Sequence, residues 1–197
     1  FKQKTAYEML RSLVGSEMCI RDRALAGAPL LAQILILEPE SFQLSPGERV
    51  GVVFRASGMQ APTPEELRDA TVATDSAAFN ITSLRSDGER VLGSAPIRAP
   101  GTLVLHASLA RNGCVASAKA LVVSAKPGAG FQRRAGHKVE LVPEQDPYLL
   151  KPGQTLRVTV WVNGAAQARI DHTLRSGRQT VETRFGCSSA TLTFELP

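Results

Sequence analysis

The sequence predicts an all-β protein made of two tandem β-sandwich domains, the second of them truncated. The first observation is an internal repeat, because the stretch from Val142 to Gly164 matches an earlier stretch 106 positions before it. A repeat at a spacing close to the length of one small domain indicates two modules of the same kind. The matched pairs are Phe42 and Tyr148, Leu44 and Leu150, Pro46 and Pro152, Gly47 and Gly153, Val52 and Val158, and Gly58 and Gly164.

The second observation is that each copy holds the same turn followed by a strand pattern. The turn is Pro46-Gly47 in the first copy and Pro152-Gly153 in the second. Proline restricts φ and glycine accepts a positive φ, so each dipeptide predicts the two central positions of a type II turn. The residues from Leu156 to Val162 then alternate between apolar and polar, which predicts a strand with one buried face.

The first 32 residues are expected to lie outside the fold. Residues 1–23, FKQKTAYEMLRSLVGSEMCIRDR, resemble the conceptual translation of a sequencing adapter, and we interpret them as a non-native segment rather than as an N-terminal helix. Residues 24–32, ALAGAPLLA, resemble the end of a secretory signal peptide. Cleavage after Ala32 would make Gln33 the mature N-terminus. The alternative is a buried first strand from Ala28 to Leu37.

The remaining chain is predicted to form a first β-sandwich domain over 33–125, a linker over 126–135 and an incomplete second domain over 136–197. About four strands are expected in the second domain, whereas a sandwich uses about seven. In the first domain, Thr63-Pro64-Glu65-Glu66 has the residue types that begin a helix, which we expect to run to Arg68. Asn112-Gly113 between two apolar runs predicts a β-hairpin.

The charges do not indicate a nucleic-acid partner. The formal net charge is +5, and it falls to +3 without residues 1–23, which hold five basic and three acidic residues. The remaining Lys and Arg residues are scattered rather than clustered, apart from Arg133-Arg134 in the predicted linker. No segment of the sequence predicts a membrane span either.

The sequence does not predict an enzyme. No serine stands in a GxSxG motif, and no glycine-rich phosphate loop precedes a helix. Cys114 has no identifiable histidine or asparagine partner for nucleophilic catalysis. Cys114 and Cys187 fall in different predicted domains, so we expect independent, partly buried thiols, although an exported chain offers conditions in which they would oxidise.

Three segments resemble a large family of bacterial periplasmic proteins of unknown function, often described as NikM-like components of nickel or cobalt uptake. They are ILILEPESFQLSPGERV (34–50), CVASAKALV (114–122) and GHKVELVPEQDPYLLKPGQTLRVTVWVNG (136–164). The resemblance implies immunoglobulin-like domains, a periplasmic location and a membrane transporter component or another envelope protein as partner. It also implies a histidine ligand at the start of the mature chain, where this sequence has Gln33.

The remaining candidate ligands for a nickel or cobalt ion are His106 and His172. The three histidines are far apart in sequence and show no HxH or HxxxH spacing. Alternation places His172 on an apolar strand face, where a hydrogen-bonded core histidine is the alternative reading. His106 is expected at a partly exposed position, and His137 at the start of the second domain is equally consistent with a turn residue.

Trp161 is expected on the polar face of its strand. We hypothesise that it packs against the first domain or a partner, and the alternative is a local cover over a sheet edge. The expected function is therefore that of a non-catalytic periplasmic binding protein, accessory to nickel or cobalt uptake. The alternative function is a structural or protein-binding module of the cell envelope that binds no metal.

Overall fold

The computed structural model describes residues 33–58 and 60–197, and this part of the chain is all-β apart from one short 3-10 helix. The segments 1–23 and 24–32, for which an adapter origin and a signal-peptide remnant were predicted, lie outside the described residues. The strands are β1 (Ile34–Pro39), β2 (Gln43–Leu44), β3 (Arg49–Ser57), β4 (Thr71–Ala73), β5 (Ala78–Asn80), β6 (Thr82–Ser86), β7 (Arg90–Pro96), β8 (Gly101–Arg111), β9 (Cys114–Ser124), β10 (Val139–Pro143), β11 (Thr155–Val162), β12 (Ala165–Thr173), β13 (Gly177–Phe185) and β14 (Ser188–Leu196), and the 3-10 helix η2 (Pro147–Leu149) precedes β11.

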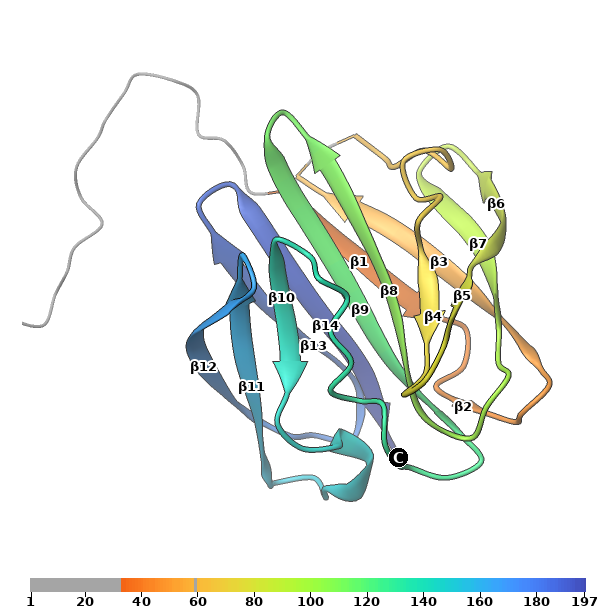
Figure 1. Cartoon of the computed structure of the whole chain (residues 1–197), viewed down its shortest axis with the longest axis vertical. Coiled ribbons are helices and arrows are strands. Elements are labelled where there is room, and N and C mark those ends of the chain that lie inside the picture. Colours follow the sequence, from red (N-terminus) through yellow and green to blue (C-terminus); the bar gives the residue numbers. More distant parts are fainter. Residues whose placement is uncertain (1–32, 59) are drawn as a thin grey trace, which may run out of the picture. The chain divides into compact units, whose positions relative to one another are not determined.

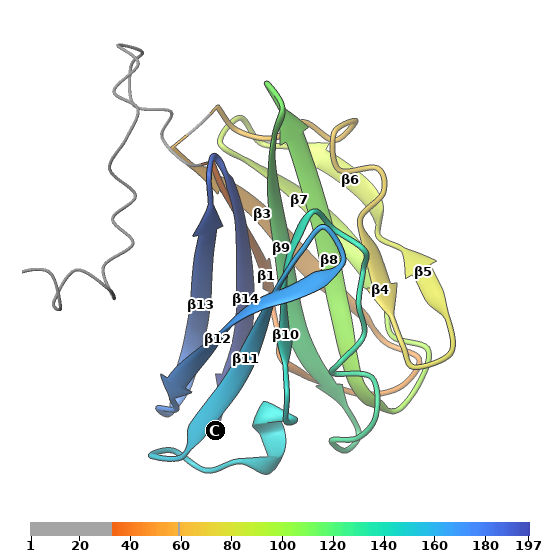
Figure 2. The ribbon, with the colours of Figure 1, turned by 60° about the vertical axis from the view of Figure 1, so that its left-hand side comes forward.

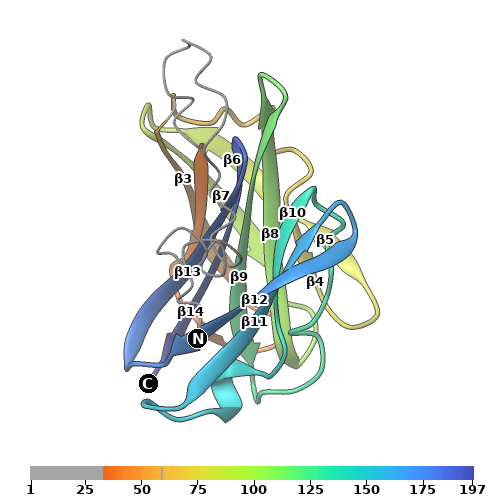
Figure 3. The ribbon, with the colours of Figure 1, turned by 90° about the vertical axis from the view of Figure 1, so that its left-hand side faces the viewer.

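The strands form three sheets. A four-stranded sheet has the order β1-β3-β7-β6, and a three-stranded sheet has the order β10-β11-β12. Between them lies a seven-stranded sheet, here called the central sheet, with the order β13-β14-β9-β8-β4-β5 and with β2 added beside β9. Figure 1 shows β8 and β9 between the strands of the four-stranded sheet on one side and β10 to β12 on the other, and Figure 2 and Figure 3 give two turned views of the same layers.

Each face of the central sheet covers its own hydrophobic core. Leu103 and Leu105 of β8 pack with residues of the four-stranded sheet, whereas Val104 between them packs with β10, β11 and β14. This follows from the geometry of a strand, because successive side chains point to opposite faces. The arrangement confirms the predicted all-β fold with sandwich-like packing, and it leaves β9 buried along almost its whole length.

The internal repeat corresponds to two similar pieces of structure. β1 pairs with β3 in the first copy and β10 pairs with β11 in the second, both antiparallel. Gly47 has a φ of 92° and Gly153 a φ of 90°, as a type II turn requires after Pro46 and Pro152. The turn hydrogen bonds run from the amide of Glu48 to the carbonyl of Ser45 and from the amide of Gln154 to the carbonyl of Lys151.

The predicted β8–β9 hairpin is also present. Asn112 and Gly113 both have positive φ, 52° and 77°, which is the signature of a type I′ turn. The two strands pair from Gly101 opposite Ser124 to Arg111 opposite Cys114.

The two predicted domains share the central sheet. β14, from the segment 136–197, runs parallel to β9 of the segment 33–125, with Ser189 opposite Ala116. The described residues form one compact unit. The boundaries at 126–135 stay a prediction, but any division there cuts through a continuous sheet.

The helix expected from Thr63 to Arg68 is not formed, and these residues make turns instead. The hydrogen bonds of the capping motif are present, because the amide of Thr63 donates to Glu66 and the amide of Glu66 donates to the Thr63 hydroxyl. The guanidinium of Arg111 binds Glu66 and the carbonyls of Gln60 and Ala61. These contacts fix the segment on β8, and a single turn is too short to propagate a helix by itself.

The expectation of two independent thiols is wrong, because Cys114 and Cys187 form a disulfide bond. Cys114 begins β9 and Cys187 stands in the turn before β14, and these two strands are neighbours in the central sheet. The parallel pairing brings the two Cα atoms to 5.4 Å, within the usual range for a disulfide. The two cysteines fall in different predicted domains, so the sequence does not indicate this proximity.

No helix in the described part of the chain has the length and apolar character needed to cross a membrane.

Reducing the Cys114–Cys187 disulfide is expected to lower the free energy of unfolding. The bond closes a loop across 73 positions of sequence. A cross-link over a loop of this length stabilises by about 4 kcal/mol when it acts by restricting the unfolded chain. Urea unfolding with and without reductant measures the difference, and a Cys114→Ala/Cys187→Ala double variant should match the reduced protein. Equal midpoints under oxidising and reducing conditions would contradict the prediction.

Glu66→Gln is expected to lower the free energy of unfolding by about 1 kcal/mol near neutral pH. This value is at the upper end for a partly exposed ion pair, because the contact between Glu66 and Arg111 is bidentate. The hydrogen bond from Arg111 lowers the pKa of Glu66 to about 2. Since the folded pKa lies below the unfolded one, this stability is present above the ordinary pKa range of glutamate and is lost as the pH falls toward 2. Unfolding measured from pH 7 to pH 2 should show the variant and the wild type converging. Glu65→Gln, at an exposed neighbour, is the control that should change little.

Candidate functional site

A row of polar side chains crosses the face of the central sheet that is turned toward the three-stranded sheet. His106 of β8 lies opposite Thr71 of β4 on one side and opposite Lys119 of β9 on the other. Glu140 of β10 and His137, which precedes that strand, complete the group. We call Thr71, His106, Lys119, His137 and Glu140 the polar cluster. Four of its members come from four different strands, β4, β8, β9 and β10, and His137 comes from the segment before β10.

The centre of the polar cluster is a buried ion pair between Lys119 and Glu140. The Lys119 Nζ lies 2.5 Å from the Glu140 Oε1, and the two side chains are only 3% and 0% exposed. Lys119 also donates to the carbonyl of Arg133, and Glu140 accepts from the amide of Ala135. These bonds hold the predicted linker against the central sheet. A buried pair of this kind needs such additional partners, because desolvating two charges is costly.

Two histidines meet beside this ion pair. The ring centroids of His106 and His137 are 5.2 Å apart, with the ring planes 70° to one another. The Nε2 of His106 is 2.7 Å from the Thr71 hydroxyl, and this hydrogen bond leaves Nδ1 as the second ring nitrogen. The Nδ1 of His106, the Nε2 of His137 and the Oε2 of Glu140 are all buried without a hydrogen-bond partner. Buried polar atoms usually have partners, so three such atoms in one group mark it as unusual.

The surroundings shift the pKa values of the cluster. Burial, followed by the charges of His137 and Lys119, lowers the pKa of His106 to about 4. Burial also lowers the pKa of His137, and it lowers that of Lys119 against the opposing attraction of Glu140. Burial by itself would raise the pKa of Glu140, but the Lys119 ammonium and the hydrogen bonds outweigh it, so the net direction is down. At neutral pH both imidazoles are therefore uncharged beside an ionised carboxylate.

Arg134 covers the outer side of the cluster. Its Nε lies 3.8 Å from the Glu140 Oε2, and its guanidinium stacks 3.9 Å above the Trp161 ring. Trp161 thus packs against the predicted linker, on the outer face of the three-stranded sheet. An open groove of about 500 Å³ runs beside the ring and is lined by Thr159, Ala166, Gln167, Ala168 and Arg169.

The structure does not bring His172 to this cluster. His172, on β12, hydrogen bonds through Nε2 to the side chain of Gln179 and packs edge-on against Phe194. Its surroundings are those of a hydrogen-bonded, half-buried histidine, whereas those of His106 include a second imidazole. Within the described residues, no three His, Cys, Asp or Glu side chains are grouped so that they could hold a metal ion.

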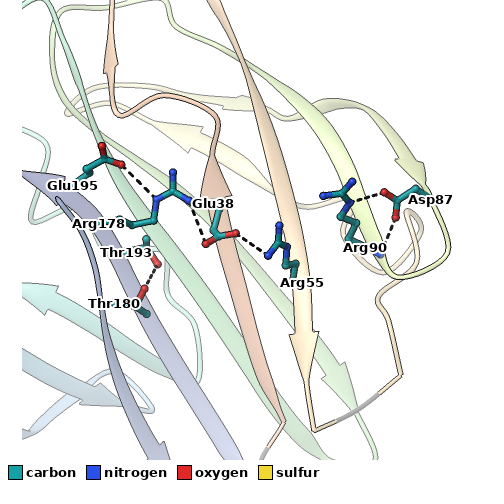
Figure 4. Close-up of polar contacts among 8 residues, drawn as sticks. All are labelled: Glu38, Arg55, Asp87, Arg90, Arg178, Thr180, Thr193 and Glu195. Carbon is teal, nitrogen blue, oxygen red and sulfur yellow. Dashed lines mark hydrogen bonds and ion pairs between the residues drawn. The ribbon is translucent and has the colours of Figure 1, made fainter.

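Other charged groups lie on the surface. Figure 4 shows a chain of ion pairs in which Arg178 bridges Glu195 and Glu38, and Glu38 also contacts Arg55. The same view shows the separate pair of Asp87 and Arg90 and the hydroxyl contact between Thr180 and Thr193. The two arginines of this chain of ion pairs, Arg178 and Arg55, are about half exposed, with exposed fractions of 44% and 53%. Exposed ion pairs contribute little to the free energy of unfolding, so this network of ion pairs is an ordinary surface feature.

Sequence reasoning missed His137, Lys119 and Glu140 as members of a site. One signal was available, because Lys119 is the only charged residue in the run CVASAKALVV and Glu140 stands within VELVP. A charged residue in a strand that is otherwise small and apolar is buried only when it is paired. The identity of the partner depends on the fold.

The chain was compared with models of known protein families. Residues 106–186 match a domain of unknown function, DUF4198. The matched range contains His106, Lys119, His137 and Glu140. Comparison with curated proteins finds no significant match.

Breaking the buried ion pair on one side is expected to destabilise the fold strongly. Lys119→Met or Glu140→Leu alone should cost about 3–5 kcal/mol, because each leaves an unpaired buried charge. The Lys119→Met/Glu140→Leu double variant should lose less stability than either single variant, since it buries no charge. Urea unfolding of the four proteins completes a double-mutant cycle. Additive losses would show that the two charges do not depend on one another.

Proposed function

We propose that this protein is a non-catalytic binding protein of the bacterial periplasm that serves transition-metal uptake and holds the ion through His106 and His137. The observation that carries the proposal is the meeting of two imidazoles, each with one buried nitrogen that lacks a hydrogen-bond partner. His106 and His172 are separate candidate ligands in the sequence, and this proposal takes His137 in place of His172.

The two histidines suit a nickel or cobalt ion. Imidazole is a favoured ligand for both metals. Two imidazoles that bind one tetrahedral ion at about 2.0 Å place their ring centroids about 5 Å apart, and the observed separation is 5.2 Å. Metal-binding histidines commonly use the second ring nitrogen for a hydrogen bond that fixes the ring, as the Nε2 of His106 does with Thr71.

The disulfide supports the proposed compartment. Disulfides persist in oxidising environments such as the bacterial periplasm and are rare in the cytosol. The Cys114–Cys187 bond is therefore consistent with export. The resemblance to NikM-like proteins supports nickel or cobalt as the ion, and it makes a membrane transporter component the proposed partner.

The proposal of a non-catalytic role is supported by the bonding of two candidate nucleophiles, Cys114 and Ser117. Cys114 is held in the disulfide. The hydroxyl of Ser117, which lies on the same face of β9 as Lys119, is within hydrogen-bond distance of the backbone carbonyls of Val139 and Ser189, either of which can accept its proton. Neither group is arranged beside a base in the way that nucleophilic catalysis requires.

Titration of Ni(II), Co(II), Cu(II) and Zn(II) into the purified protein by calorimetry tests the proposal. The wild type should bind at least one of these ions with micromolar affinity. His106→Ala and His137→Ala should each weaken binding at least tenfold, because each removes one of two ligands. His172→Ala, a partly buried histidine elsewhere in the fold, should keep wild-type affinity. Binding that survives both cluster variants, or that is lost only in His172→Ala, would overturn the assignment.

A protein-binding module of the envelope is the second candidate function. Trp161 favours it, because the ring is partly exposed beside an open groove and aromatic residues are enriched at protein interfaces. Absence of heat with every ion in the titration would favour this candidate over metal binding. The partner would then be an envelope protein that contacts the outer face of the three-stranded sheet.

A further inference from the structure

We propose that the protein self-associates through β12 (Ala165–Thr173), which pairs antiparallel with β12 of a second copy about a two-fold axis at Ile170. The three-stranded sheets of the two copies then form one continuous sheet. This inference is independent of the proposed function, because it concerns the edge of the three-stranded sheet and not the polar cluster.

β12 is a weakly protected edge strand. Among the described residues its backbone pairs with β11 alone, and Figure 1 shows it at the margin of the ribbon. The segment Ala165–Ala168 is exposed and contains neither a charge nor a proline, which are two devices that keep an edge strand from pairing with another chain. The β-bulge at Gln167 is a third such device, but it leaves Ala168 to Thr173 in regular pairing.

The other sheet edges in the described part of the chain are short, covered or charged. β5 has three residues, β6 has five, and β10 is buried along its whole length. The edge of β1 is covered by β14, where the Thr191 hydroxyl donates to the carbonyl of Leu35. β13 is as long as β12, but no antiparallel register with a second copy places all three of its charged residues opposite an opposite charge. These residues are Arg178, Glu182 and Arg184.

Ile170 supplies an apolar contact at the centre of the strand pair. Its side chain packs on the second hydrophobic core but stays partly exposed at the edge of the sheet. A two-fold axis at this residue places it opposite Ile170 of the second copy, and apolar residues in directly opposite positions stabilise paired strands. The central apolar residue of β13, Val181, is already buried, so pairing at that edge gains less from apolar burial.

The charges of β12 select this register. Side chains that lie directly opposite each other point to the same side of the sheet, so the two-fold axis passes through a residue and not between two residues. An axis at Ile170 places Arg169 opposite Asp171 of the second copy, and the reverse pair forms by symmetry. An axis one residue earlier places Arg169 opposite itself, and an axis one residue later does the same with Asp171. Opposite charges stabilise directly opposed positions, whereas like charges destabilise them.

The neighbouring strand continues this alternation of charge. Arg157 of β11 lies opposite Asp171, and its Nε is 3.4 Å from the Oδ1 of Asp171. In the dimer, Asp171 therefore lies between Arg157 of its own copy and Arg169 of the second copy. The side chains of Arg169 and Asp171 are 70% and 65% exposed, so neither charge has to leave a buried site to meet the second copy.

Sedimentation velocity of the chain from about 10 μM to about 1 mM tests the proposal, because a homodimer forms by mass action. One pair of strands makes a small interface, so the wild type should show a weak equilibrium between monomer and dimer. Arg169→Asp and Asp171→Arg each place like charges opposite one another, and each should weaken dimerisation about tenfold or more.

Mixing the two single variants tests the register itself. One variant presents only negative charges at the two positions and the other presents only positive charges. An equimolar mixture should therefore form a mixed dimer, although neither variant forms a dimer well alone. The Arg169→Asp/Asp171→Arg double variant exchanges the two charges within one chain and should recover dimerisation.

Two substitutions in β13 are the matched controls. Arg184→Asp and Glu182→Arg make the same changes of charge at exposed positions of the other long edge strand, and both should keep wild-type dimerisation. Circular dichroism of each variant establishes that the fold is kept. Hydrogen exchange gives a second readout, because the amides of β12 should exchange more slowly at the concentrations at which the dimer forms.

Each contrary outcome overturns a defined part of the proposal. A wild type that stays monomeric over the whole concentration range overturns self-association. A dimer that persists in both single variants of β12, or that is lost in the controls, overturns β12 as its interface. Loss in the single variants without a mixed dimer overturns the register at Ile170. None of these outcomes bears on metal binding by the histidines.

Discussion

The burial of β9 on both faces is the constraint on which the rest of the structure depends. The four-stranded sheet covers one face of this strand and the three-stranded sheet covers the other, so its side chains must fit two cores at once. On the first face the strand presents Ala116, Ala118 and Ala120, which let the sheets approach closely. On the second face it presents Ser117, Lys119 and Leu121, and every polar atom there needs a partner from the facing layer. The bonds of Ser117 to Val139 and of Lys119 to Glu140 meet that need, and they also fix where β10 lies.

The local features of this fold could be predicted from the sequence, because their causes are local. A Pro-Gly pair and an Asn-Gly pair require positive φ at defined positions, and Gly47, Gly153 and Asn112 adopt it. The alternation from Leu156 to Val162 places β11 within one residue of its observed start. The helix predicted at Thr63 is absent for the opposite reason, because its shape depends on distant residues. Its capping bonds form as expected, but contacts with Arg111, 45 positions away from Glu66, decide its shape.

The polar cluster could not be predicted, because it depends on pairings between distant strands. His106 lies on β8 and His137 lies 31 positions later, in the segment before β10, and no short motif connects them. The parallel pairing of β14 with β9 is equally hidden, and with it the approach of Cys114 to Cys187. What the sequence does show is a single lysine in a strand of small and apolar residues. That observation indicates a buried charge and does not name its partner.

The polar composition of β13 has a consequence for how the protein behaves at high concentration. This strand ends the central sheet among the described residues, so its outer row of amide and carbonyl groups is free to pair with another chain. Its sequence, GRQTVETRF, carries Arg178, Glu182 and Arg184 at exposed positions. A second copy that docked against this edge would have to remove water from these charged side chains, which is costly. The charged residues of β13 therefore protect this edge of the sheet against edge-to-edge aggregation.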